Sequence, residues 1–447
     1  MSKKTRGPSS LRSLKQNAKI PSKDLEQVFL VSSPYTDSAL ATAILSRVIM
    51  RLGGTFHISF ESPIISLDRV NELRSKHESA SVIFVGIDTM GKKKIRKGKK
   101  YPIFIGGTSE SEQTESLTLG TSNTIPASVY VIAEEHLTNH DYELQIAAAA
   151  TLLHSGSTKL SLKPNRELVD QAKEKKLIEE RKGIRLFGFN YLPLDELFLY
   201  NMRPFIKGIS GNQKACDALL NEADIPITKL RTPMSELSKE EAQHFTQHLT
   251  SILLDKIGPN IISDILGTDF ILTRENETSP LRYLSGLKAM AETAWARQEQ
   301  GAAMSVWIGD RGRALRNMID THLTHQKDVI STIIRLESKL KGTSTETSTL
   351  IEMSRVQDEL LTDIGRVALQ SDMVTHKRPL LINNDSSTVA IWTTEMVNVN
   401  LVLYTLQKQK LNPILTSTKS LMFKDLPKES REDVLNALDV KTKEEAS

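Results

Sequence analysis

Short apolar segments alternate with amphipathic segments across residues 27–106, and this alternation limits the fold more than any other feature of the chain. Strands are expected at residues 27–33, 55–61, 81–88 and 101–106. Helices are expected at residues 38–52, where Gly53 and Gly54 follow, and at residues 67–77. Because helices or basic loops separate the strands, the pattern predicts an α/β domain with a parallel sheet and helices on its faces.

The middle of the chain is expected to be mainly helical. Residues 127–137 fit either a strand or a helix, because SVYVIA is strand-like while the apolar positions also follow helical spacing. Residues 145–153 indicate a buried helix, and residues 165–182 a strongly charged helix that links two parts of the molecule. Further helices are expected near residues 212–222 and 239–257.

A second α/β domain is expected over residues 275–440. The pattern there predicts strands at 268–275, 303–308, 378–383 and 388–393. It predicts helices at 281–297, 309–324 with continuation toward 341, 357–370 and 431–438. The complete division is a disordered basic arm at 1–25, a first domain at 26–164, a segment completing it at 165–274, the second domain, and a tail at 441–447.

Composition excludes several classes of protein. Hydrophobic residues make up 39% and charged residues 25% of the 447 residues, as in ordinary globular proteins. The longest apolar run, residues 146–153, is far short of the ~18 residues of a membrane span. The polar, basic N-terminus does not have the pattern of a signal peptide. A single cysteine, Cys216, excludes an internal disulfide framework. The expected location is the cytoplasm.

Basic charge is concentrated in two short patches, although the net charge is only +4. Residues 1–23 contain lysines and arginines but no acid, and KKKIRKGKK forms residues 92–100. Such patches neutralise phosphates, or they are a solvated tail and a solvated loop. The candidate nucleic-acid contacts in the loop are Lys92, Lys93, Lys94, Arg96, Lys97, Lys99 and Lys100.

Three segments, in their order and spacing, resemble one family. They are PLDELFLYNMRPFIKGISG (193–211) with LLNEADI (219–225), LSGLKAMAETAWARQEQGAAMSVWIGD (284–310), and DELLTDIGRVALQSDMVTHKRPLLI (358–382). The chain resembles the archaeal RecJ-like branch of the DHH phosphoesterases through most of residues 26–440. The resemblance implies a DHH-type domain, a smaller DHH-associated α/β domain that opens with a helix and then a strand, and a cleft between the domains. Active members use manganese or magnesium to hydrolyse single-stranded nucleic acid. The branch also includes the non-catalytic cofactor that joins the MCM helicase and GINS at eukaryotic replication forks.

The metal-binding motifs of that family are degenerate here. Its His-x-Asp-x-Asp-Gly motif aligns with Ser33, Tyr35, Asp37 and Ser38, so that one acid remains. The acid of its second motif aligns with Gly86 in one register and with Asp88 in another. The Asp-His-His motif aligns with Gly106, Gly107 and Thr108, and the last ligand position falls at His154 and Ser155.

The remaining acids are too few for a pair of divalent ions, which need several carboxylates and imidazoles. We therefore expect no catalytic residue, no metal and no other cofactor, with Asp37 and Asp88 as relict positions. Asp37 is alternatively a cap of the helix expected at 38–52. His136, His140 and His154 lack an acidic set at ligand spacing. Residues 410–423 occupy the place of the family's glycine- and histidine-containing loop that grips DNA, and they contain neither residue type.

The function expected from the resemblance is that of a non-catalytic RecJ-like replisome component. It would bind GINS through residues 275–440, support the MCM helicase and contact single-stranded DNA. Arg297 aligns with a family arginine and contacts either a phosphate or an internal carboxylate. One alternative is a metal-dependent single-strand 5′ exonuclease with rearranged ligands. A regulatory nucleotide-binding protein is another, although no phosphate-loop motif supports it.

Overall fold

The computed structural model describes residues 10–17, 19–91, 95, 100–107, 116–153, 160–257, 262, 264–340, 350–371, 373–374, 379–394 and 397–438. The chain forms an α/β protein with two compact units. Unit 1 comprises residues 1–179, 272–274 and 299–315, and unit 2 comprises residues 180–271, 275–298 and 316–447. This division differs from the boundaries expected at residues 164 and 274, because the chain crosses between the units several times.

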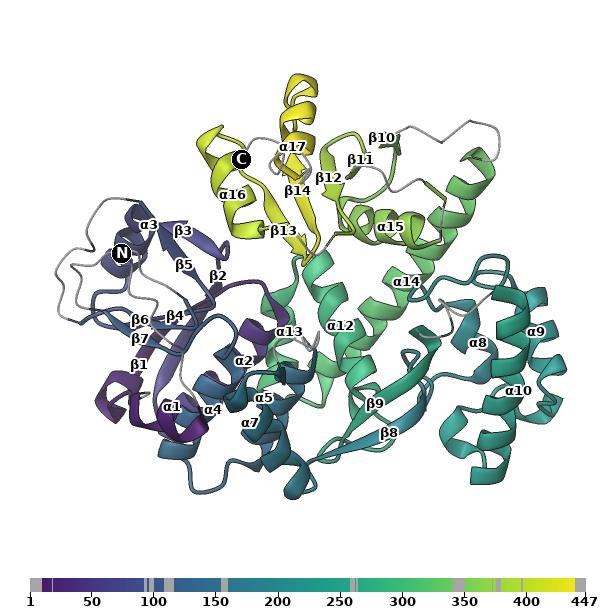
Figure 1. Cartoon of the computed structure of the whole chain (residues 1–447), viewed down its shortest axis with the longest axis horizontal. Coiled ribbons are helices and arrows are strands. Elements are labelled where there is room, and N and C mark those ends of the chain that lie inside the picture. The colour runs from purple at the N-terminus through teal and green to yellow at the C-terminus, as the bar shows by residue number, and fades with distance from the viewer. Residues whose placement is uncertain are drawn as a thin grey trace. The chain divides into compact units, whose positions relative to one another are not determined.

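Unit 1 is built on a five-stranded parallel sheet with the order β2-β1-β4-β6-β7 (Figure 1). Its strands are β1 (Gln27–Ser32), β2 (Thr55–Phe60), β4 (Ser81–Val85), β6 (Ile103–Ile105) and β7 (Leu117–Leu119). Two short strands, β3 (Ile64–Ser66) and β5 (Asp88–Met90), pair in parallel outside it. The parallel sheet predicted from the alternation of segments is therefore confirmed.

Helices cover both faces of this sheet. On one face, α3 (Leu67–Lys76) packs through Val70 and Leu73 against Phe29 and Phe84 of the strands. The helices packed against one another beyond the other face are α2 (Thr36–Arg51), α4 (Ile125–His136), α5 (Asp141–Leu153) and α7 (Lys163–Glu174). The ambiguous segment at 127–137 is thus helical, and a proline in the first turn of α4 suits its start.

The basic arm at residues 1–25 was predicted to be disordered, but it contains two helical segments in the structure. Helix α1 (Leu11–Asn17) packs on α4 and α7, and a 3₁₀ helix spans Ser22–Leu25. Apolar residues spaced among the lysines explain the difference, since Leu14, Ile20 and Leu25 are buried. Lys15 forms an ion pair with Glu134 at 2.6 Å. Residues 1–9 and the tail at 441–447 lie outside the described residues.

The strand predicted at 303–308 is wrong, because this segment belongs to helix α13 (Gln300–Ile308). The helix packs against α2 in unit 1. Ala303, Met304 and Trp307 are buried at helical spacing, which a short apolar run conceals in the sequence. Arg47 of α2 donates a hydrogen bond from Nη1 to the carbonyl of Ile308 at 2.7 Å, and so satisfies a free carbonyl at the end of α13.

Unit 2 contains a mixed five-stranded sheet with the order β10-β11-β12-β14-β13. Its strands are β10 (Leu350–Glu352), β11 (Leu380–Asn383), β12 (Ser387–Ile391), β13 (Ile414–Ser417) and β14 (Ser420–Lys424). Only β10 and β11 pair in parallel among these strands. The helices of this part are α12 (Leu284–Ala296), α14 (Arg313–Leu340), whose first residues belong to unit 1, α15 (Asp358–Gln370), α16 (Val399–Lys408) and α17 (Arg431–Leu438).

The remainder of unit 2 is a helical layer with its own core. It contains α8 (Leu194–Leu199), α9 (Gln213–Glu222) and α10 (Lys239–Ile257). The 3₁₀ helices of unit 2 are Ile227–Lys229, Met234–Glu236, Pro280–Arg282 and Lys428–Ser430, and Met234 belongs to the core of the helical layer. Strand β8 (Ile178–Ile184) pairs with β9 (Leu266–Leu272). The charged helix predicted at 165–182 therefore ends early. Lys176 has a φ of +54°, which ends helical geometry, and β8 begins at Ile178.

Among the described residues, no helix has both the length and the apolar character needed to cross a membrane.

Candidate functional site

Five residues form a row where the parallel strands of unit 1 end. The register aligns Ser32, Phe60, Val85, Ile105 and Leu119 across the sheet, so the next residue of each strand emerges at the same edge. These next residues are Ser33, Glu61, Gly86, Gly106 and Gly120. Backbone bonds extend the ladder to this row: Ser33 donates to the Val85 carbonyl at 2.9 Å and Gly86 to the Ile105 carbonyl at 2.8 Å. We call this row the carboxyl edge.

The order of the strands makes one point of the carboxyl edge the natural binding position. From β1 the chain moves outward to β2, and it later returns to place β4, β6 and β7 on the other side of β1. The crevice of an open α/β sheet lies at such a reversal, which here falls between the ends of β1 and β4. Ser33 and Gly86 occupy these two ends, and helix α2 begins three residues after Ser33. The aligned positions Ser33 and Gly86 therefore lie on neighbouring strand ends.

The space at the reversal is closed around Gly86. A Cβ atom on Gly86 would lie 2.2 Å from the Ser38 hydroxyl oxygen and 2.7 Å from the Ser33 hydroxyl oxygen. Its φ of +66° is also unfavourable for a residue with a side chain. Both hydroxyl oxygens are buried, and neither has a hydrogen-bond partner among the described residues. Two serine side chains thus occupy the volume that an acid at position 86 would need.

The same closure recurs at the next strand. A Cβ on Gly106, which has a φ of +72°, would lie 2.1 Å from Cγ1 of Ile125 in the first turn of α4. A Cβ on Gly107 would lie 1.9 Å from the backbone oxygen of Ile87. Side chains at these positions would collide with a helix and with backbone. The glycines aligned with the Asp-His-His motif are therefore required by packing, and the third position, Thr108, lies outside the described residues.

Three carboxylates remain at or next to the carboxyl edge within the described residues. Asp37 is 4% exposed, and its Oδ1 accepts a hydrogen bond from the Ser38 backbone N–H at 2.8 Å in the first turn of α2. Asp88 is the first residue of β5. Glu61, which sequence reasoning missed, forms an ion pair with Arg69 at 2.5 Å. An acid as the last residue of the strand predicted at 55–61 is the signal that would have identified Glu61.

Tyr35 interacts electrostatically with two of these acids. Burial raises the pKa of its phenol above the ordinary value, and the nearby carboxylates of Asp37 and Asp88 raise it further. The phenol therefore stays protonated at any physiological pH, and it supplies no negative charge to a cation. Tyr35 is the N-cap residue of α2, and its carbonyl accepts the Ala39 N–H at 2.9 Å.

These residues do not fit the pair of divalent metal ions that active members of the resembling family use. Manganese and magnesium take about six hard oxygen ligands each, and two ions need several carboxylates to balance their charge. At this edge, the described donors are two serine hydroxyls, a protonated phenol, Asp37, Asp88, and Glu61, whose charge Arg69 already balances. No catalytic step through metal ions follows from this donor set.

The basic loop at 92–100 is described at two of its residues. Ile95 is buried in the core beneath α3, and Lys100 donates a hydrogen bond from Nζ to the Ser81 hydroxyl at 3.0 Å. Ser81 begins β4, so Lys100 lies at the edge of the sheet opposite to the carboxyl edge, where the loop returns to the start of β6. Its contact with nucleic acid stays a prediction. Lys92, Lys93, Lys94, Arg96, Lys97 and Lys99 lie outside the described residues, as does His154.

Arg297 lies in unit 2 at the end of α12, and its Nη1 is 3.6 Å from Oε1 of Glu359. The sequence left open whether Arg297 contacts a phosphate or an internal carboxylate, and in the structure it contacts the carboxylate of Glu359.

Unit 2 contains a second cluster of ionisable groups, which sequence reasoning missed. Arg203 forms ion pairs with Glu292 of α12 and Asp363 of α15, and His325 of α14 bonds to Asp363 at 2.8 Å. Burial alone would raise the pKa of Glu292, but the charges of Arg203, Arg366 and Lys288 outweigh it and lower the pKa to about 2. Burial likewise opposes ionisation of Asp363, yet Arg203 holds its pKa well below the ordinary range.

His322 completes this buried cluster, which we call the Arg203 cluster. Its Nδ1 lies 2.8 Å from the Thr293 hydroxyl, and its ring packs edge-on against Phe187. Burial lowers the pKa of His322 to about 3, and the positive charge of Arg203 contributes to the decrease. The imidazole is thus neutral at physiological pH. Because guanidinium groups already neutralise the acids, the Arg203 cluster is a structural network rather than a cation site.

The two units together define a class of fold. A parallel α/β unit with a reversal of strand order is followed by an α/β unit with a mixed sheet. This confirms the fold class that the sequence predicted. No protein-family model matches the chain, and no curated protein sequence does.

Among solved structures, the chain is similar to CDC45 from Entamoeba histolytica. The match has a TM-score of 0.55 at 11% identity and covers 96% of this chain and 96% of that chain. A second similar structure is RecJ from Thermus thermophilus in complex with Mn²⁺, with a TM-score of 0.47 at 10% identity. That match covers 95% of this chain but only 54% of the RecJ chain. At such identities the likeness to CDC45 establishes the fold alone.

Proposed function

We propose that this protein is a non-catalytic, CDC45-like component of a replisome, which binds GINS and supports the MCM helicase. The observation that carries the proposal is the closed carboxyl edge, where Ser33 and Ser38 occupy the space beside Gly86. In the register that aligns Gly86 with the acid of the family's second motif, a DHH-like scaffold that cannot accept an acid at this position has lost a requirement of two-metal hydrolysis.

The end-to-end likeness to a CDC45 structure supports this role over that of an isolated nuclease domain. The match covers 96% of both chains, so both units of this chain fall within it. The proposal places the GINS contact on residues 275–440 and the protein in the cytoplasm of an archaeon. In the same proposal, the cations at 92–100 contact single-stranded DNA through phosphates, which carry no sequence information.

Co-purification tests the proposed partnership directly. The full chain, co-expressed with the GINS subunits of the same host, should copurify with them at low and moderate salt, and adding MCM should give a ternary complex. Absence of association at every salt concentration would contradict the proposal. Two exposed leucines of unit 2 offer a matched pair of variants: Leu401 on α16 is 45% exposed and Leu254 on α10 is 47% exposed. Leu401→Asp should weaken the complex, whereas Leu254→Asp, outside 275–440, should not.

The alternative enzyme is a single-strand 5′ exonuclease with rearranged ligands. The observation in its favour is that Asp37 and Asp88 both act on Tyr35, so that two carboxylates do face one region. A labelled single-stranded oligonucleotide incubated with Mn²⁺ should remain intact with the wild-type protein. Cleavage that disappears in Asp37→Ala would establish the nuclease instead. In the same samples, reversing the charges at 92–100 should reduce the salt dependence of DNA binding.

A further inference from the structure

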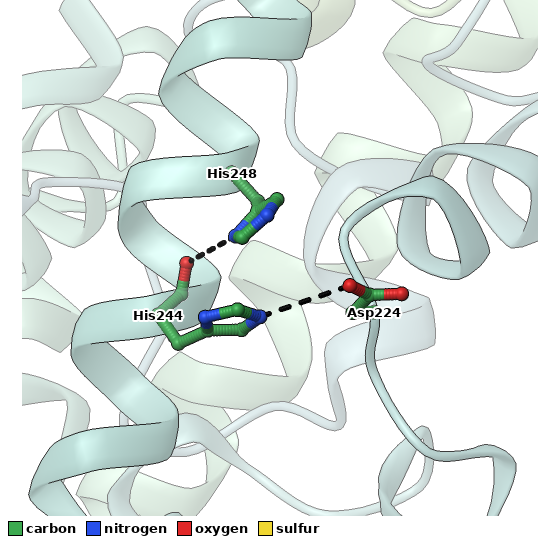
Figure 2. Close-up of side chains that lie close together, drawn as sticks. All are labelled: Asp224, His244 and His248. Carbon is green, nitrogen blue, oxygen red and sulfur yellow. Dashed lines mark hydrogen bonds and ion pairs between the residues drawn. The ribbon is translucent and has the colours of Figure 1, made fainter.

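We infer that the helical layer of unit 2 contains a zinc site formed by Asp224, His244 and His248. One oxygen or nitrogen atom from each side chain lies within 4.8 Å of the others, and Figure 2 shows the three groups facing one another. The inference concerns a surface remote from the carboxyl edge in sequence, and it does not depend on the proposed function.

The two histidines are placed by helical geometry. They lie four residues apart on α10, so their side chains project from the same face on successive turns. Their ring centroids are 4.0 Å apart. Nδ1 of His248 donates a hydrogen bond to the backbone carbonyl of His244 at 3.1 Å. This bond places the proton on Nδ1 and leaves Nε2 of His248 with the lone pair that a metal ion needs.

Asp224 brings the third ligand from a separate element. It follows α9, and its φ of +56° turns the chain so that its carboxylate faces α10. Oδ2 of Asp224 is 3.8 Å from Nε2 of His244. Tetrahedral zinc, with bonds of ~2.0–2.2 Å, holds its ligand atoms about 3.3 Å apart. Small rotations of side chains that are half exposed or more would close the difference.

The backbone beneath the three side chains is fixed by a shared core. Phe245 and Leu249 of α10 and Leu219 and Leu220 of α9 belong to one buried cluster. The two elements therefore hold a constant separation, and only surface side chains must rearrange when an ion binds. Preorganisation of this kind favours a metal site over a chance surface cluster.

The donor set selects the ion. Two imidazoles and one carboxylate suit zinc and similar transition metals, whereas magnesium prefers oxygen ligands and octahedral geometry. Three protein ligands leave a fourth position open for water or for a donor from another molecule. Sequence reasoning did not indicate this set and singled out other histidines instead. In the structure, His136 bonds to the Ile20 carbonyl at 2.9 Å and His140 to the Leu137 carbonyl at 3.2 Å.

The test uses the full chain without an affinity tag. Calorimetric titration with Zn²⁺ should give one site at pH 7.5, and excess Mg²⁺ should not displace the ion. Co²⁺ in place of Zn²⁺ should give the intense visible absorption of a four-coordinate ion. His244→Ala and His248→Ala should each weaken binding by roughly tenfold or more, as should Asp224→Asn to a smaller extent. His57→Ala, which removes another exposed histidine, should leave it unchanged.

Two results would overturn the inference. One is the absence of Zn²⁺ binding at micromolar concentrations in the wild-type protein. The other is binding that persists unchanged in both His244→Ala and His248→Ala. Circular dichroism checks that the variants fold, and since the replaced side chains lie at the surface we expect their spectra to match the wild type.

Discussion

The carboxyl edge of unit 1 and the Arg203 cluster of unit 2 differ in where ligand-type side chains are found. The edge lies at the reversal of strand order, where an open α/β sheet places its binding crevice, yet three of its five positions are glycines beside packed side chains. The Arg203 cluster lies within a structural core, yet it gathers Glu292, Asp363 and two histidines. The location of a site in a fold and the presence of ligand-type residues are thus separate facts.

The difference shows what decides whether a group of acids binds a cation. In the Arg203 cluster, guanidinium groups occupy the position where a metal ion would otherwise balance the charge. At the carboxyl edge, buried serine hydroxyls fill the volume without charge. Either arrangement keeps the fold and removes the need for an ion. Three experiments can break or sharpen this comparison.

The largest effect is expected from Arg203→Met. The substitution leaves the buried Asp363 and the partly buried Glu292 without their main partner, and loss of one member of a buried ion pair costs about 3–5 kcal/mol. Urea unfolding followed by the fluorescence of the tryptophans measures the loss. Lys214→Met, at an exposed position of the same unit, is the control and should change stability by less than ~0.5 kcal/mol.

A double variant separates charge from packing in that experiment. Arg203→Met combined with Asp363→Asn should be more stable than Arg203→Met alone, because the unpaired carboxylate is removed as well. Equal stability of the two variants would mean that the arginine acts through its volume, and the contrast with the carboxyl edge would then fail.

The pH dependence of unit 2 should show an intermediate effect. The pKa of His322 is about 3 in the folded protein and near 6.5 when unfolded, so the unfolded state binds an additional proton between these values. Stability should therefore decrease as pH falls through this window, by about 1.4 kcal/mol per pH unit. Urea unfolding at pH 6 and pH 4 should show that His322→Gln loses less stability than the wild type, by roughly 2–3 kcal/mol.

His57→Gln is the control for the pH experiment, since it removes an exposed histidine and leaves the Arg203 cluster intact. A wild-type slope that equals the His322→Gln slope would show that His322 is protonated in the folded state, contrary to its burial.

The smallest effect is expected at the carboxyl edge itself. Gly86→Ala and Gly53→Ala both place a side chain at positive φ, but only position 86 is crowded, as nothing lies within 4 Å of a Cβ at position 53. Gly86→Ala should be less stable than Gly53→Ala by about 1–2 kcal/mol. Hydrogen exchange of peptides from unit 1 under mild denaturant measures both. Adding Ser38→Ala should recover part of the loss, and no recovery would show that the hydroxyl is not the obstacle.

The sequence was sufficient for the parts of the fold that follow local patterning. Alternating strands and helices predicted the parallel sheet, and the aligned motif positions Ser33, Ser38 and Gly86 do meet at one edge. Patterning failed where tertiary contacts decide. Leu14 and Ile20 are isolated apolar residues in a basic segment, yet both are buried, and α1 packs on α4 and α7.

Side-chain clusters from distant segments were beyond sequence reasoning. Arg203 and Asp363 are separated by 160 residues, and nothing in their surroundings in the sequence marks them as partners. The same is true of Asp224 and the histidines of α10, which come together because two helices share a core. Glu61 is different, since its position after a strand was available and was not used.

The crowding at Gly86 has a consequence for how such a protein can change over generations. Replacing Gly86 by an acid would require the side chains at positions 33 and 38 to rearrange and the turn to relax as well. Each single replacement along that route leaves either a collision or a void. Placing an acid at position 86 would thus demand concerted mutation at several positions.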